Sequence, residues 1–355
     1  METSTYLKQL SQAAGPSGHE STVRQLIREL WAPFADEIRT DALGNLIALQ
    51  KAKSPTASSQ TPPALMVAVH MDEIGLIVTS IERGFLHIGP IGGADPRVLL
   101  GQEVTVHGEA ELPGVIGSRP PHVLRAEDRK KVPSWEQFFV DLGLPEEIVR
   151  TKVHVGDAIS IRQTVHDLQN ERVAGKTLDN RASVTVLTLA LEALHTCDHA
   201  WDLYAVATVQ EEVGLQGAIT SAYGIMPQAA IAMDVTFGLQ ANDNAPGAFE
   251  LDQGPTIGIG PNLHPYMVRK LREMAEREEI PYQLEPLPGH SGTDAWGIQV
   301  AREGIPTGLL SIPLRYMHQP VEMLALRDIE RTARLLTAFI RGLAPDERPT
   351  WEEEA

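Results

Sequence analysis

Two spacings of apolar residues alternate along this chain and predict two kinds of element. Apolar side chains three and four positions apart are typical of amphipathic helices, and they occur in residues 20–30, 183–194, 264–278 and 326–342. Short apolar runs are typical of buried strands, and they cover residues 45–51, 64–70, 202–210, 228–235 and 307–312. Ser17 and Glu20 stand three apart before the first helix, which predicts a capping box. Strands that alternate with helices favour an α/β fold, a mixed sheet sandwiched by helices.

Residues 73–162 follow a different pattern. Gly and Pro separate short alternating apolar runs there, which predicts a small β-barrel or sandwich. One charged stretch within it, residues 126–143, is predicted to be helical. We expect the β-rich segment to be an insertion, so that residues 1–72 and 163–355 form one discontinuous domain and residues 73–162 form a second. The Ser- and Pro-rich residues 52–63 predict a surface loop that joins a hairpin.

The composition of the chain excludes several kinds of partner and of structural site. The chain has 355 residues, 43% of them hydrophobic, which is enough for a sizeable core and for two domains. Its 47 acidic and 30 basic residues give a formal net charge of −17, which argues against nucleic acid or an anionic membrane as a partner. The single cysteine, Cys197, excludes an intrachain disulfide and a cysteine-based zinc cluster. The polar N-terminus lacks the build of a signal peptide and no apolar run is long enough to span a membrane, so we expect a cytoplasmic protein.

Acids and histidines stand where the predicted strands stop. Ligands collect at the carboxyl ends of strands in open α/β sheets. Taken singly, each of these residues has a more ordinary role in a turn or as a helix cap. Taken together, they are the ligand types that zinc, cobalt and manganese prefer. The residues are His70, Asp72, Asp179, Glu211, Glu212, Asp234 and His318.

Glu211 and Glu212 are adjacent at the end of a predicted buried strand. Two half-buried carboxylates repel each other and lose hydration, which costs several kcal/mol unless a cation compensates. Gly214 just beyond them permits an abrupt turn, so that both side chains can reach the same place. The pair makes chemical sense if one glutamate binds a metal ion and the other is the general base for a water that the ion acidifies.

Six motifs in this order resemble the M42 family of metallo-aminopeptidases, which includes tetrahedral cytosolic and glutamyl aminopeptidase-like members. The motifs are VHMDEIG, GKTLDNRA, TVQEEVGLQGA, MDVTFG, GTDA and LRYMHQPVE, and the likeness runs from residues 13–20 to the last helix. The resemblance implies two divalent ions per subunit, Zn²⁺ or Co²⁺, with Mn²⁺ also compatible. Their ligands would be His70 and Asp234 for the first ion, Glu212 and His318 for the second, and Asp179 between them. Asp72 would orient His70, and Glu211 would be the general base.

The resemblance also implies an activity and an assembly. A hydroxide that bridges the metal ions would attack the first peptide bond of short peptides with a free N-terminus. The inserted segment would be a PDZ-like domain that mediates dimerisation, and dimers would assemble into a dodecamer. The preferred N-terminal residue is not determined.

One stretch departs from the expected glycine-rich pattern and reads GHSGTDAWG (residues 289–297). Thr293 or Asp294 there predicts a helix cap. His290 and Ser291 are instead candidates for the wall of a substrate pocket. Arg315 and Tyr316, just before His318, are similarly placed candidates without an assigned role.

The sequence leaves three alternatives to an aminopeptidase. A di-metal deacylase or carboxypeptidase would share the ligands but bind another end of the substrate. A glycosidase needs two free carboxylates around a sugar bond, whereas the acids here are committed to metals. A scaffold with structural metals has no need of a free carboxylate such as Glu211 beside a filled ligand shell.

Overall fold

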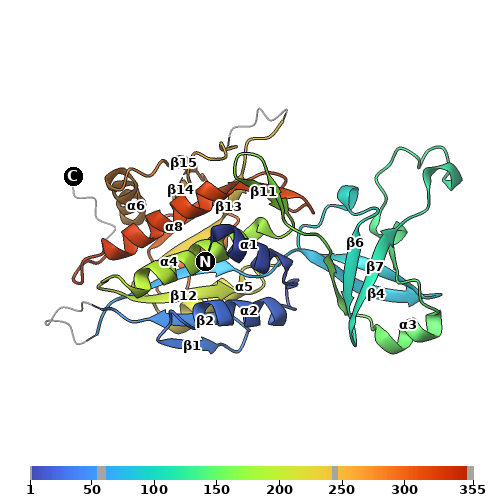
Figure 1. The fold of residues 1–355 in the computed structure, drawn as a ribbon, viewed down its shortest axis with the longest axis horizontal. Helices are drawn as coiled ribbons and strands as arrows, with labels where there is room; N and C mark the ends of the chain where they lie inside the picture. Colours follow the sequence, from blue (N-terminus) through green and yellow to red (C-terminus); the bar gives the residue numbers. More distant parts are fainter. Residues whose placement is uncertain (1, 54–60, 242–246, 350–355) are drawn as a thin grey trace.

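A computed structural model of the protein describes residues 2–53, 61–241 and 247–349. It shows a large sheet covered by helices and a small barrel beside it (Figure 1). The main sheet has eight strands in the order β1-β2-β12-β3-β13-β16-β14-β15. Their bounds are Glu37–Thr40 (β1), Leu46–Gln50 (β2), Asp202–Thr208 (β12), Ala64–His70 (β3), Ala229–Phe237 (β13), Thr307–Leu314 (β16), Thr256–Ile259 (β14) and Gln283–Pro286 (β15).

The four central strands, β12, β3, β13 and β16, run parallel to one another. Alternate residues of β3 enter two different cores, with Leu65 and Val67 in one and Met66 and Ala68 in the other. Side chains of a strand alternate between its faces, and a parallel sheet covered on both faces therefore has continuously apolar strands. This is why the chain is apolar along β3 up to His70.

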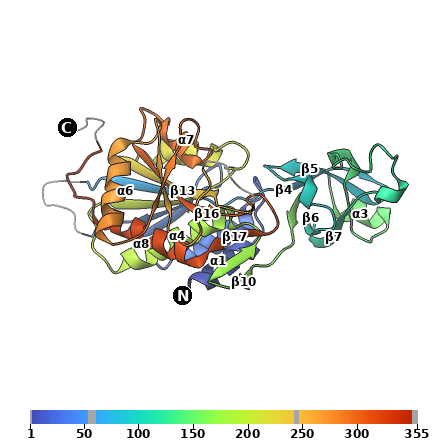
Figure 2. The ribbon, with the colours of Figure 1, turned by 90° about the horizontal axis from the view of Figure 1, so that it is seen from above.

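Helices cover both faces of the main sheet. One face packs against α1 (Thr3–Gln12), α2 (Ser21–Trp31), α4 (Leu178–His195), α6 (Pro265–Arg277) and α8 (Leu326–Arg341). The other face packs against α5 (Gln216–Ile225) and α7 (Asp294–Gln299). Figure 2 shows α7 on one side of the sheet and α1, α4 and α8 on the other. The expected mixed sheet between helices is confirmed.

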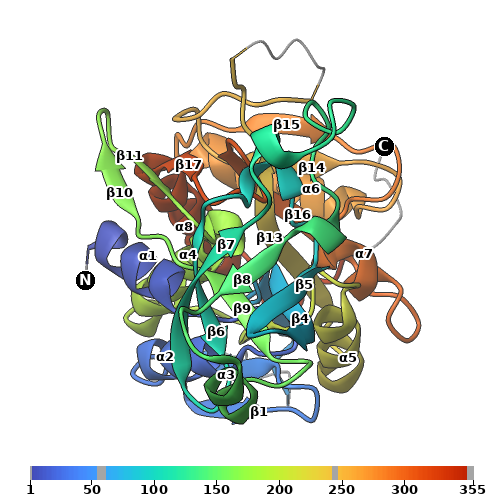
Figure 3. The same cartoon turned by 90° about the vertical axis from the view of Figure 1, so that its right-hand side faces the viewer.

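The second part is a closed barrel of six antiparallel strands in the order β4-β5-β8-β7-β6-β9. Figure 3 shows the barrel in front of the main sheet. Its interior is apolar, with Val104, Val106, Phe138 and Val140 all at 0% exposure. The expected β-rich insertion is therefore a barrel and not a sandwich. The bounds are Gly75–Glu82 (β4), Phe85–Ile91 (β5), Phe139–Asp141 (β8), Glu111–Gly117 (β7), Glu103–His107 (β6) and Ala158–Ile161 (β9), with helix α3 at Glu146–Lys152.

A small third sheet follows the barrel along the chain and lies against α4 and α8. It consists of β10 (His166–Leu168), β11 (Arg172–Gly175) and β17 (Glu322–Ala325), all antiparallel. Gly175, at the end of β11, pairs with Glu322 at the start of β17. This register places Glu322 close to the chain that leads into α4.

Three local expectations from the sequence are wrong. Strands β2 and β3 do not form a hairpin, because β12 lies between them in the sheet. Residues 126–143 contain no α-helix; they form turns, a 3₁₀ helix at Trp135–Gln137 and strand β8. Ser17 does not form a capping box, because α2 begins at Ser21 and its N-cap residue, Glu20, accepts the backbone N–H of Gly18.

Thr293 does cap a helix, as expected. Its Oγ1 accepts the backbone N–H of Ala295 at the start of α7. Within the ranges that the structure describes, no helix has both the length and the apolar character needed to cross a membrane.

Candidate active site

Four parallel strands bring the polar residues of the sequence motifs to one edge of the main sheet. His70 is the last residue of β3 and lies beside Thr208, the last residue of β12. On the other side of β3, the register with β13 places Asp234 at the level of His70. Asp234 in turn pairs with Ser311 of β16. Because open α/β sheets bind ligands at the carboxyl ends of their strands, this edge is the candidate site.

Asp179 lies at the centre of this edge, at the start of α4. Thr177, just before the helix, has a φ of 64°, and the Asp179–Asn180 peptide bond is cis. Oδ1 of Asp179 is 3.1 Å from Nε2 of His70, and its Oδ2 is 3.3 Å from Nε2 of His318. One carboxylate therefore faces two imidazoles, which is the arrangement needed to bridge two cations.

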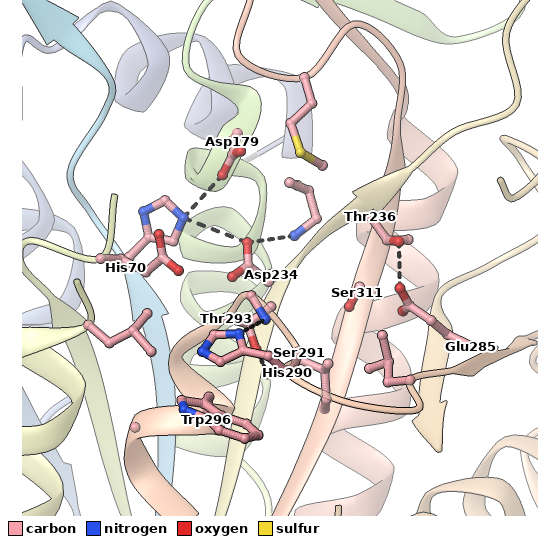
Figure 4. A pocket seen from close by; sticks show the side chains of 18 of the residues that line it. His70, Asp179, Asp234, Thr236, Glu285, His290, Ser291, Thr293, Trp296 and Ser311 are labelled. Carbon is pink, nitrogen blue, oxygen red and sulfur yellow. Dashed lines mark hydrogen bonds and ion pairs between the residues drawn. The ribbon is translucent and has the colours of Figure 1, made fainter. Parts of the chain in front are cut away.

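Each of the two histidines also faces an acid of its own. Nε2 of His70 is 3.6 Å from Oδ1 of Asp234, and Nε2 of His318 is 3.3 Å from Oε2 of Glu212. Single ligand atoms of His70, Asp179 and Glu212 all lie within 4.8 Å of one another. The five ligand candidates of the sequence are thus brought together, and Figure 4 shows the ring of His70 facing both Asp179 and Asp234. Imidazole nitrogens and carboxylate oxygens suit zinc, cobalt and manganese.

The acids of this cluster outnumber its histidines. Burial and repulsion among the carboxylates raise the pKa values of some of these acids. Burial raises the pKa of Glu212 and of Asp234, and the charge of Asp179 raises both further. Burial lowers the pKa of His318, but hydrogen bonds to Asp179 and Glu212 outweigh it and raise that pKa to about 11. Among the described residues, the three acids Asp179, Glu212 and Asp234 face only two histidines in this cluster. Divalent cations would supply the missing positive charge.

Glu211 is a free carboxyl beside the cluster. It is half-buried in the same cavity, and within the described chain it forms no ion pair with His70 or His318. Burial raises the pKa of Glu211 to about 10; His70 opposes this shift, and Asp234 reinforces it. A cation nearby favours the ionised carboxylate, which is the form that a general base needs.

The turn that carries the two glutamates interrupts the alternation of the strand. β12 ends at Thr208, and Gln210 then adopts a φ of 57° and Gly214 a φ of 141°. The backbone N–H of Gly214 donates to the C=O of Glu211 over 3.0 Å and closes the turn. Gly214 suits this position because it has no Cβ to clash at positive φ.

Asp72 is buried beneath this turn and has more partners than the sequence indicated. Its backbone C=O is 3.2 Å from Nδ1 of His70, and its Oδ1 is 3.6 Å from the same nitrogen. The same carboxylate also accepts the backbone N–H groups of Glu211 (3.1 Å) and Glu212 (3.2 Å) and the hydroxyl of Ser17 (2.6 Å). Asp72 therefore contacts both the His70 imidazole and the turn that carries the two glutamates.

A cavity of about 960 Å³ opens beside the cluster. Among the four weaker candidates for substrate contact, His290 and Ser291 belong to its wall. Arg315 and Tyr316 are not among the described residues that line it. Nε of Arg315 instead donates to the C=O of Leu239.

Comparisons with known proteins agree with this geometry. The family model for M42 glutamyl aminopeptidase matches residues 44–335. A lysyl aminopeptidase from Pyrococcus furiosus is 38% identical over 345 residues, which cover 96% of this chain and 97% of that protein. The crystal structure of a TET aminopeptidase from a marine sediment archaeon of the Thaumarchaeota has 33% identity and a TM-score of 0.89, and the match covers 96% of each chain. The TET1 peptidase of Pyrococcus horikoshii has 32% identity and a TM-score of 0.85, over 96% of this chain and 100% of that one.

The chain belongs to the M42 aminopeptidase family. It is therefore a hydrolase that acts on peptide bonds, and the resemblance seen in the six motifs is confirmed. M42 peptidases depend on metal ions, and the cluster of acids and histidines in this chain could hold one.

Glu322 is a part of this M42 site to which the sequence assigned no role. It is buried, with 3% exposure. Its Oε2 accepts the backbone N–H of Asp179, and its Oε1 accepts the backbone N–H of His318, each over 3.0 Å. His318 has a φ of 60°, a strained conformation that persists only where neighbours hold it. The one available signal was the position of Glu322 in the motif LRYMHQPVE, four residues after His318.

The barrel also reaches this M42 site. Gly92 and Gly93 directly follow strand β5, which ends at Ile91. A Cβ on Gly93 would lie 2.5 Å from Nδ1 of His318, and one on Gly92 would lie 3.3 Å from Cβ of Glu212. The inserted segment therefore packs directly against two of the candidate metal ligands.

Proposed function

We propose that the chain is a di-metal aminopeptidase that removes N-terminal residues from short peptides. The observation that carries this proposal is the position of Asp179, whose two oxygens face His70 and His318. His70 and Asp234 would hold one ion, Glu212 and His318 the other, and Asp179 would bridge them. Zn²⁺ and Co²⁺ suit these ligands best, and Mn²⁺ is also compatible.

Glu211 carries the proton chemistry in this proposal. Bound metal ions would acidify a water and polarise the scissile carbonyl. Glu211 takes the proton from the attacking water and delivers it to the leaving amine. Asp72 keeps Glu211 in place through the backbone N–H, so that the carboxylate stays beside the reacting atoms.

A scaffold with purely structural metals fits this geometry poorly. A half-buried carboxyl with a raised pKa and no ion pair to the two histidines is costly to keep beside the ligands unless it reacts. A glycosidase would need two free carboxylates on either side of a sugar bond. Glu212, Asp234 and Asp179 instead contact histidines.

We further infer that this chain assembles with copies of itself. The Pyrococcus horikoshii relative can form a tetrahedron or a large octahedral shell. In this chain, residues 73–162 would form the dimerisation domain, and residues 1–72 with 163–355 the catalytic domain. Dimers would then build a dodecamer, which sedimentation or mass photometry of the purified protein would detect.

A peptide panel tests the proposed activity. The metal-reconstituted protein is given short peptides with a free or an acetylated N-terminus, and the released residues are identified. We expect release of the first residue from free N-termini only, with loss of activity when a chelator is added. Equal or faster cleavage of the acetylated peptides would contradict the proposal and favour a deacylase or carboxypeptidase.

A further inference from the structure

Arg315 stands where strand β16 ends and its chain leaves the main sheet. β16 pairs with β13 as far as Leu314, whose partner is Phe237. The backbone N–H of Gly238 still donates to the C=O of Leu314 over 2.7 Å. One residue later the chain has another partner, because Arg315 and Met323 exchange both backbone hydrogen bonds, over 2.8 and 3.0 Å. The backbone of Arg315 is therefore not available to the chain that follows β13.

The side chain of Arg315 takes the place of this backbone partner. Its Nε donates to the C=O of Leu239 over 2.5 Å. Leu239 is half-buried, and a backbone C=O that is removed from water needs a donor. Across residues 2–53, 61–241 and 247–349, Arg315 forms no ion pair with an acid. Its guanidinium group is therefore used to hold a backbone segment and not to balance a charge.

Leu239 belongs to a pair of segments that form one wall of the cavity. The backbone N–H of Phe249 donates to the C=O of Phe237 over 2.8 Å, and the N–H of Leu239 donates to the C=O of Phe249 over 2.7 Å. Phe237 and Phe249, which we call the aromatic wall, both line the cavity. Phe237 is 64% exposed, so little packing fixes its ring. The position of the aromatic wall therefore depends on the hydrogen bonds at its base, one of which Arg315 donates.

The backbone of Arg315 is joined to the other side of the cavity as well. Its partner Met323 directly follows Glu322 in strand β17. Glu322 accepts the backbone N–H groups of Asp179 and His318. Arg315 therefore contacts the aromatic wall with its side chain and the strand that supports two candidate metal ligands with its backbone.

We propose that Arg315 is a positioning residue that holds the aromatic wall at a fixed distance from the candidate metal ligands. The inference rests on the proposed function, because it assumes that a peptide occupies this cavity. Contacts with the wall bind the substrate and the transition state alike, and the loss of such uniform binding raises KM without changing kcat. A loosened wall must also be ordered when the peptide binds, which weakens binding further.

Steady-state kinetics of Arg315→Met test this assignment. Methionine keeps an unbranched stem but has no donor for the C=O of Leu239. With a short peptide that begins with Leu and has a free N-terminus, we expect KM to rise on the order of 10-fold, as for the loss of one hydrogen bond. The kcat should stay within about 3-fold of wild type, and the Zn²⁺ affinity measured by isothermal titration should be unchanged. Arg315→Lys keeps a donor on a long stem and should recover part of the loss.

Arg302→Met is the matched control. Nε of Arg302 donates to the C=O of Tyr223 over 2.7 Å, which is the same kind of hydrogen bond at an exposed place. Arg302 is not among the described residues that line the cavity, so KM and kcat should match wild type. An unchanged KM in Arg315→Met, or an equal rise in Arg302→Met, would overturn the proposal. A fall in kcat and in Zn²⁺ affinity as large as the rise in KM would also overturn it and make Arg315 a support of the metal ligands.

Hydrogen exchange separates this inference from the proposed function, because it needs no substrate. The amides of Leu239 and Phe249 should exchange faster in Arg315→Met than in wild type, while the amides of β16 stay protected. If both amides remain as protected as in Arg302→Met, the assignment of Arg315 is wrong whatever the activity. If the wild-type protein releases no N-terminal residue from any peptide, the aminopeptidase proposal fails, and the exchange of these two amides alone decides whether Arg315 holds the wall.

Discussion

The interior of the barrel and the carboxyl edge of the main sheet bury opposite kinds of side chain. Val104, Phe138 and Val140 fill the barrel with apolar surface at 0% exposure. Such burial stabilises a fold by about 25 cal/mol for each Å² removed from water. The sheet edge instead buries carboxyl groups such as Asp72 and Glu322, whose removal from water is costly unless each finds partners.

Because of this difference, we expect substitutions in the barrel core to change mainly stability and substitutions in the site to change mainly activity. The barrel depends on packing, and its core tolerates changes that conserve volume. The site depends on a complete set of hydrogen bonds and ion pairs. If one partner is removed, a buried charge remains unpaired in a medium of low dielectric constant, which destabilises the folded protein. The two regions meet where Gly92 and Gly93 pack against Glu212 and His318. Substitutions in the barrel core, in the site and at this junction should therefore have distinct effects.

The largest effect on activity is expected at the sheet edge, for Glu211→Gln. The amide cannot accept a proton from water, so kcat should fall by roughly 10²- to 10⁴-fold. Metal content and thermal unfolding should stay close to wild type, because Glu211 is not an expected ligand. Metal analysis, calorimetry and peptide hydrolysis on the same preparation measure all three. A variant that kept more than a tenth of wild-type kcat would show that another group is the base.

The largest effect on stability is expected in the barrel, for Phe138→Ala. Removing this buried ring should lower the free energy of unfolding of the barrel by about 3–5 kcal/mol. Hydrogen exchange should rise in β4 and β7 and stay slow in β3 of the main sheet. At a temperature where the barrel remains folded, kcat should be unchanged. Faster exchange in β3 as well would show that the two regions unfold together.

A smaller effect on activity is expected at the junction, for Gly93→Ala. The added methyl group would lie 2.5 Å from Nδ1 of His318 and must displace that ring. We expect a loss of roughly 10- to 100-fold in kcat/KM or in metal affinity, as for other changes that misplace a ligand. Isothermal titration with Zn²⁺ and peptide hydrolysis would measure both.

Gly224→Ala in α5 is the control for this substitution, because a Cβ there meets no atom within 4 Å. It should leave metal affinity and activity unchanged. If Gly93→Ala were as active and as well metallated as this control, the barrel segment would have no part in positioning His318.

The sequence by itself determined most of the local elements and most of the candidate site, although it wrongly predicted a helix over residues 126–143. The strands that carry His70, Thr208 and Asp234 follow from short apolar runs, since a strand buried on both faces must be apolar throughout. Only β13 continues past its acid, to Phe237. The polar residues at the ends of these runs identify the edge where they meet. The adjacent pair Glu211 and Glu212 pointed to a cation because isolated buried carboxylates are costly.

The tertiary structure alone decided which distant residues support that site. The spacing of Ser17 and Glu20 predicts a helix cap, but the Ser17 hydroxyl donates to Asp72, 55 positions away. Glu322 holds the backbone of Asp179, 143 positions away. The side chain of Arg315 donates to the backbone of Leu239, 76 positions away. Spacing along the chain records local periodicity, whereas these hydrogen bonds depend on strand order, such as the place of β12 between β2 and β3, and strand order is set by long-range packing.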